Sequence, residues 1–194
     1  EITYLQNQGY KLDLIHFIVR LMTLAVILVD KLKDLEKTLH HAADLCSEGE
    51  FIEAIQLYDR ILSKEPKNID ALIDKGVALQ NLGRFKLALR CFSKATHLNP
   101  ENITAILNEG TALHSLGMFD EAISKYDRAL FLDKKCAMAL AYKGMSLGEQ
   151  GKVSEALNCF KKALLIDKDY DIALISKKIA QGLIDSEQKI GKKS

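Results

Sequence analysis

Residues 69–102 read IDALIDKGVALQNLGRFKLALRCFSKATHLNPEN, and the same pattern of small, apolar and turn residues returns every 34 residues between positions 35 and 170. The most regular turn residue of this pattern is a glycine, found as Gly49, Gly83, Gly117 and Gly151. On both sides of each glycine, apolar residues recur at the spacing of an amphipathic helix. A fixed period of this length predicts an array of stacked helix–turn–helix units.

Each of the three later units carries a glycine in its first half, then an alanine and an aromatic residue in its second half. This repeat skeleton consists of Gly76, Ala88, Phe92, Gly110, Ala122, Tyr126, Gly144, Ala156 and Phe160. The small residues predict a close approach of the two helices in a unit, and Phe92 is predicted to fill the space between one pair and the next. Because one pair cannot bury its apolar face alone, the units are expected to stack.

This pattern of small residues, an aromatic residue and a proline at fixed places resembles the tetratricopeptide repeat family. The resemblance implies an all-α fold, an α-solenoid of four tandem helix–turn–helix repeats that forms a superhelix with a concave groove. We place the repeats at 35–68, 69–102, 103–136 and 137–170. A capping helix and a basic tail are expected at 171–194, and an apolar helical segment outside the repeat is expected at 1–34.

Some positions depart from the family pattern. The leucine that usually precedes the small residue of the first helix is replaced by His41, Lys75, Glu109 and Lys143, and Lys134 and Lys168 stand in place of proline. Side chains that could cap helices also recur. Asn68 and Asn102 are predicted to cap first helices, and Asp120 and Ser154 are predicted to precede second helices.

The resemblance further implies that the first helices line the groove and that the groove binds another protein or peptide. The groove residues predicted in this way are His40, Asp70, Asp74, Asn81, Thr104, Asn108, Thr111, His114, Tyr142 and Met145. Asp74, Asn108 and Tyr142 share one repeat position on successive helices, which suits hydrogen bonding to an extended peptide or a partner helix. The alternative is that these three are simply solvated, and Ile73, Val77 and Leu107 are equally compatible with packing.

Several classes of function are disfavoured. A net charge of +1 with no basic stripe argues against nucleic-acid binding. Acidic Asp70 and Asp74 argue against the family's mode of gripping acidic chaperone tails. No arrangement of residues predicts catalysis, a cofactor or a metal site, and four cysteines without metal-ligand spacing indicate a reducing, cytoplasmic setting.

The leading hypothesis is therefore a non-enzymatic scaffold for protein–protein interaction. The alternatives are a substrate-recruiting part of a larger enzyme, such as a glycosyltransferase, and a membrane-attached assembly factor. A first residue other than methionine, Glu1, is compatible with a piece of a longer protein.

Both ends carry unusual apolar surface. Residues 12–29 read LDLIHFIVRLMTLAVILV and are apolar nearly all round. Three interpretations compete: packing on the first repeat or on another chain, contact with or passage through a membrane, and a remnant of an upstream domain. The last helix carries Ile172, Ile175, Ile179 and Leu183 at helical spacing. Since exposed apolar patches mark interaction sites, self-association through the end helices is predicted, with Ile175 and Ile179 at the contact.

Overall fold

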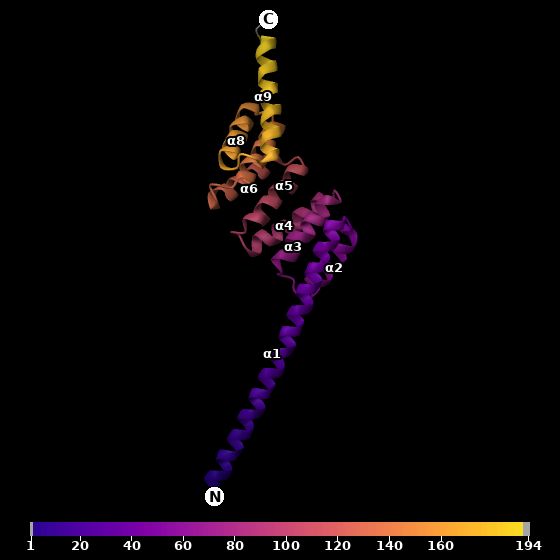
Figure 1. The fold of residues 1–194 in the computed structure, drawn as a ribbon, viewed down its shortest axis with the longest axis vertical. Coiled ribbons are helices and arrows are strands. Elements are labelled where there is room, and N and C mark those ends of the chain that lie inside the picture. Colours follow the sequence, from indigo (N-terminus) through magenta and orange to yellow (C-terminus); the bar gives the residue numbers. More distant parts are fainter. Residues whose placement is uncertain (1, 192–194) are drawn as a thin grey trace.

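The computed structural model describes residues 2–191, with side chains over residues 16–186. This part of the chain forms helices joined by short turns and contains no strand, which confirms the predicted all-α solenoid. The helices are α1 (Ile2–Glu48), α2 (Phe51–Lys64), α3 (Ile69–Asn81), α4 (Phe85–Leu98), α5 (Ile103–Ser115), α6 (Phe119–Leu132), α7 (Ala137–Glu149), α8 (Val153–Ile166) and α9 (Asp171–Gly191). Figure 1 shows α1 running as a long rod away from the stacked pairs, with α9 at the opposite end of the array.

Helix α1 unites two parts that the sequence analysis kept separate. The predicted N-terminal segment and the first helix of the first repeat form one helix of 47 residues, with no break at position 34. The junction DKLKDLEK at residues 30–37 contains no glycine or proline, so nothing in it interrupts the helical hydrogen bonds. Only the part of α1 from Leu35 onward packs against α2, around the buried Ala42.

A glycine in a left-handed conformation makes the turn within each pair. Gly49, Gly83, Gly117 and Gly151 have φ angles between 70° and 86°, which residues with a side chain rarely adopt. At the second of these turns the Arg84 N–H donates to the Leu79 carbonyl at 2.9 Å, which satisfies a carbonyl group left free at the helix end. The recurring glycine therefore sets the sharp reversal that brings the second helix back onto the first.

The aromatic skeleton residues pack inside their own pairs. A Cβ atom added at Gly110 would lie 2.5 Å from the Tyr126 ring, and one at Gly144 would lie 2.6 Å from the Phe160 ring. The ring of Phe92 lies against Gly76 in the same way. The prediction that Phe92 fills the space between successive pairs is therefore incomplete. Its ring also fills the space within its own pair that Gly76 leaves by having no side chain.

The capping predictions were half right. The Asn68 and Asn102 side chains each accept a hydrogen bond of 2.9 Å, from the backbone N–H groups of Ala71 and Ala105 respectively. Asp120 and Ser154 were wrongly placed: each lies inside the first turn of its helix, and α6 and α8 begin without a side-chain cap.

Two of the polar residues that replace the family's leucine are paired across neighbouring repeats. Lys75 of α3 forms an ion pair with Asp59 of α2, and Lys143 of α7 forms one with Asp127 of α6. Both pairs join a first helix to the second helix of the preceding repeat. They keep half-exposed charges in contact with an opposite charge along one edge of the array.

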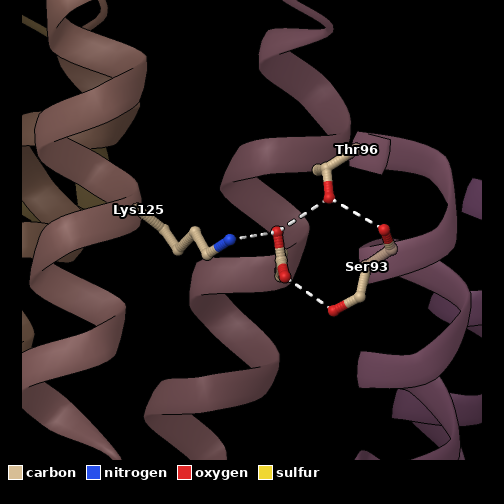
Figure 2. Close-up of polar contacts among 4 residues, drawn as sticks. Ser93, Thr96 and Lys125 are labelled. Carbon is tan, nitrogen blue, oxygen red and sulfur yellow. Dashed lines mark hydrogen bonds and ion pairs between the residues drawn. The ribbon is translucent and has the colours of Figure 1, made fainter. Parts of the chain in front are cut away.

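Glu109 of α5 occupies the same repeat position as Lys75 and Lys143, but it carries the opposite charge and is almost fully buried. Its carboxylate accepts hydrogen bonds from Ser93 Oγ at 2.6 Å and Thr96 Oγ1 at 3.0 Å, both on α4. The ammonium group of Lys125, on α6, lies 2.7 Å from Oε2 of the carboxylate, the oxygen that also accepts from Thr96, as Figure 2 shows. A buried charge is tolerated only with such partners, so this network joins three helices and is structural.

Two glycines of α7 give a matched test of this packing. Gly144→Ala should lower the free energy of unfolding by about 1–3 kcal/mol, because its methyl group would overlap the buried Phe160 ring. Gly148→Ala should leave it unchanged or raise it by up to about 1 kcal/mol, because the new methyl group would meet the Ala156 side chain at an ordinary 4.0 Å. Urea unfolding followed by circular dichroism measures both, and equal effects of the two changes would contradict the assigned packing.

Candidate functional site: the concave face of the first helices

The first helices of the repeats form the inner layer of the array. Each of α1, α3, α5 and α7 contacts the next first helix, whereas no comparable contact joins consecutive second helices in the described part of the chain. The first helices therefore lie closer together, and the array curves around them. The predicted groove residues of α3, α5 and α7 consequently sit on adjacent helices of the concave side.

The predicted line of polar residues lies half-buried on this side. Among the described residues, neither the Asp74 carboxylate nor the Asn108 side-chain amide forms a hydrogen bond, so both polar groups are available to a ligand. The Tyr142 ring packs against the buried Tyr126, with the two ring centroids 5.9 Å apart. The Tyr142 ring is thus held in place by the core beneath it.

Asp74 is electrostatically unusual. Burial raises the pKa of its carboxyl group, and the negative charge of the nearby Asp70 raises that pKa further. Burial and then the Asp74 charge likewise raise the pKa of Tyr58, which lies in the core of the first pair. No cation of the described residues forms an ion pair with Asp74, so its charge is not neutralised in this way.

A hollow of about 620 Å³ between α1 and α3 brings together three predicted residues, His40, Asp70 and Asp74. Glu36 and Asp44 of α1 line the same hollow, although neither is among the groove residues named above. The walls of the hollow carry four carboxylate groups and two lysine ammonium groups, which come from Glu36, Asp44, Asp70, Asp74, Lys33 and Lys37. This end of the groove is therefore acidic.

Two predicted groove residues form contacts between successive first helices. Gln80 of α3 donates from Nε2 to Thr111 Oγ1 of α5 at 3.3 Å. The Nδ1 atom of His114, on α5, lies 2.9 Å from the hydroxyl of the buried Ser146 on α7, and burial lowers the pKa of the histidine. Thr111 and His114 thus link the helices that form the groove.

The remaining predicted residues are distributed along the groove. Thr104 is exposed on α5, and exposed Asn81 donates its side-chain N–H to the Val77 carbonyl at 3.0 Å. Met145 lines a second hollow, of about 260 Å³, between α7, α8 and α9. Ile179 of α9 lines the same hollow, and sequence reasoning did not assign it to the groove although it follows Met145 by one repeat length.

The described residues offer no support for other kinds of site. None of them form a group of three or more His, Cys, Asp or Glu side chains that could hold a metal ion. The four cysteines are unpaired, and burial raises the thiol pKa of Cys46, Cys91 and Cys159, which disfavours a reactive thiolate. No helix over the described side chains is long and apolar enough to cross a membrane. Residues 12–15 of the predicted apolar segment lie outside that range.

Comparisons with known proteins agree with this architecture. The model of the family described as "T7SS, ESX-1 secretion system protein EccA1, N-terminal domain" matches residues 6–177. None of the curated proteins compared with the chain matches it.

Three solved structures illustrate the likeness. MamA MSR-1 is 29% identical, with 69% of this chain and 77% of that chain covered and a TM-score of 0.61. A thermophilic TPR protein of Thermus thermophilus is 20% identical, with coverage of 78% and 84% and a TM-score of 0.69. The Arabidopsis OM64 TPR domain is 24% identical, with coverage of 59% and 94% and a TM-score of 0.56. The tetratricopeptide repeat fold is thereby confirmed.

The raised pKa of Asp74 predicts the effect of removing its charge. A carboxyl group with a raised pKa in the folded state opposes folding when it is ionised, and this opposition fades as pH falls through that pKa. Asp74→Asn should therefore raise the melting temperature at pH 7, and the gain should shrink as pH approaches 4. Differential scanning calorimetry of both proteins across this range measures the effect. Asp169→Asn, on an exposed turn, is the control, and an unchanged or lower melting temperature for Asp74→Asn would contradict the assignment.

Proposed function

This chain belongs to the family described as the N-terminal domain of the ESX-1 secretion system protein EccA1, and on that premise we propose that it is a scaffold whose concave groove binds a segment of another protein. The observation that carries the proposal is the row of Asp74, Asn108 and Tyr142 on three adjacent first helices. Two of these three side chains hold unused hydrogen-bonding groups on a rigid surface, as recognition of an extended peptide or a helix requires.

The groove suits binding better than chemistry. The Ser146 hydroxyl lies beside the His114 ring, but Ser146 is fully buried, so a substrate cannot reach that hydroxyl. Burial raises the pKa of the Cys46 thiol, which disfavours a reactive thiolate there. The family's description also favours a second candidate, in which the array recruits substrates for a larger protein of a secretion apparatus. Both candidates use the same groove and differ only in what the groove is attached to.

A groove variant tests the proposed function. Asp74→Ala, Asn108→Ala and Tyr142→Phe together remove the polar groups but keep the ring that packs on Tyr126, so helicity should persist. The full chain and this variant are used to capture proteins from a lysate of the source cells, with quantification by mass spectrometry. The variant should lose at least one captured protein by about tenfold or more, equivalent to about 1.4 kcal/mol.

The matched control places substitutions on the outer layer, at exposed Arg90, Lys94 and Arg128. These changes should leave the captured proteins unaltered. Loss of the same proteins from the outer-layer variant but not from the groove variant would locate binding on the convex side and contradict the proposal.

The projecting part of α1 supports a second element of the proposal, an attachment surface that another molecule covers. Over residues 16–34 the helix is exposed on all sides and carries eleven large apolar side chains, each between 45% and 65% exposed. Water-exposed apolar surface of this extent is rare in isolated proteins. We propose that a second copy of the chain covers it, and contact with a membrane surface is the competing explanation.

Light scattering of the full chain without detergent should give a mass above that of the monomer. Two variants compare opposite faces of α1. One replaces Phe17, Leu21, Leu24 and Leu28 by glutamine, and the other replaces Val19, Met22, Val26 and Val29. One of the two should restore the monomer, because helices pack through one face. A monomeric wild-type chain that sediments with anionic lipid vesicles would instead favour membrane contact. A monomeric chain that does not sediment with the vesicles would refute the attachment surface.

A further inference from the structure

One repeat position links α3 to α5 and α5 to α7, and the last repeat lacks a side chain at that position. Gln80 bonds to Thr111 across α3 and α5, and His114 bonds to Ser146 across α5 and α7. The residue 34 positions after His114 is Gly148, near the end of α7. A Cβ atom at Gly148 would have only the Ala156 methyl group within 4.0 Å among the described atoms, so nothing fills this place between α7 and α9.

The space left at Gly148 is the 260 Å³ hollow between α7, α8 and α9. Its walls are mostly apolar, from Met145, Val153, Phe160, Ile179, Ala180 and Leu183. The volume lies just below the roughly 300–1,000 Å³ of sites that enclose small molecules. Its size and lining therefore fit one large apolar side chain better than a cofactor or metabolite.

Two exposed apolar residues of α9 belong to this groove by their position in the repeat. Ile179 and Leu183 follow Met145 and Glu149 of α7 by 34 residues, and they are 61% and 50% exposed. In each earlier repeat, one face of the first helix packs against its own second helix, and in α9 the same positions carry the exposed Lys178 and Gln181. The exposed Ile179 and Leu183 side chains thus extend the concave surface.

The two ends of the groove differ in chemistry. The hollow between α1 and α3 is lined by four carboxylates and two ammonium groups, whereas the hollow at Gly148 is mostly apolar, with one carboxylate, that of Glu149, in its lining. The helices between them present Asn108, Thr104 and other uncharged side chains to the groove. Charge complementarity therefore favours a ligand that is basic at one end and apolar at the other.

We propose that the groove binds an extended segment of a partner protein that seats a Leu, Met or Phe side chain in the hollow at Gly148 and places Lys or Arg side chains against the carboxylates between α1 and α3. This inference rests on the proposed protein-binding function and specifies the partner. The hollows are three first-helix steps apart, about 24–30 Å for interaxial distances of about 8–10 Å. At about 3.3 Å per extended residue, the basic and apolar side chains are separated by roughly seven to nine residues.

Synthetic peptides test this inference directly. Fluorescein-labelled peptides carry Lys-Arg and Leu-Phe at opposite ends of an alternating Gly-Ser spacer, in both chain directions and with spacers of about four, eight and fourteen residues. Fluorescence anisotropy with the full chain should give the highest affinity for the intermediate spacer in one direction. Replacing Leu-Phe by Ser-Ser, or Lys-Arg by Glu-Glu, should reduce that affinity by about tenfold or more.

Two variants of the full chain separate the ends. Gly148→Gln places in the last repeat the residue that repeat two uses at the same position, so it should fill the hollow without disturbing the fold. It should abolish the preference for Leu-Phe over Ser-Ser. Asp70→Asn with Asp74→Asn should instead abolish the preference for Lys-Arg over Glu-Glu and weaken the dependence of affinity on salt.

The outcomes distinguish this inference from the proposed function. If no peptide binds, or if Gly148→Gln leaves the apolar preference intact, the inference is wrong. If peptides bind regardless of their ends but lose binding in the Asp74, Asn108 and Tyr142 variant, the groove function stands and only the partner chemistry fails. If the groove variant also retains every protein captured from the lysate, the proposed function fails as well.

Discussion

The packing of an aromatic ring against a glycine within each of the last three pairs is the contact on which the rest of the array depends. Because Phe92 occupies the place that a Cβ of Gly76 would take, the two helices of the pair approach closely and in one register. The same contact recurs in the next two pairs, so successive pairs have nearly the same shape and stack at a constant step. The groove is the inner side of this regular stack, and its residues need not contribute to the packing that builds it.

That separation explains which parts of the molecule the sequence predicts. Local backbone requirements explain the period of 34 residues, the turn glycines and the Asn68 cap. Such requirements select particular residue types at fixed spacing, so they can be recognised in the sequence. The continuity of α1 was not predicted, because the repeat pattern marks where a repeat begins but does not show whether the preceding helical segment runs into it without a break. The predicted start at Asp120 was wrong by two residues, because α6 begins after Met118 without a side-chain cap.

The groove was predictable in its positions but not in its shape. The 34-residue spacing places Asp74, Asn108 and Tyr142 on one line across the first helices. It cannot show that Thr111 and His114 form hydrogen bonds with neighbouring helices, because those contacts depend on the distance between repeats. The hollow at the end of the groove escaped notice for a further reason. It arises because Gly148 has no side chain and the neighbouring helices do not fill the space. Residue spacing in the sequence does not reveal such an unfilled space.

Stability and binding make opposite demands at Asp74, and this opposition is the strongest physical reason to regard the groove as functional. A half-buried carboxylate without a cation, next to the charge of Asp70, weakens the folded state at neutral pH. The buried carboxylate of Glu109, which has a structural role, is fully paired by contrast. It accepts hydrogen bonds from two hydroxyl groups and forms an ion pair with Lys125. The chain thus neutralises a buried carboxylate between its own helices but leaves one unneutralised where a partner can reach it. A cationic partner would supply the missing positive charge. Its binding would relieve the destabilisation that the ionised Asp74 causes in the free protein and would be favoured by that amount.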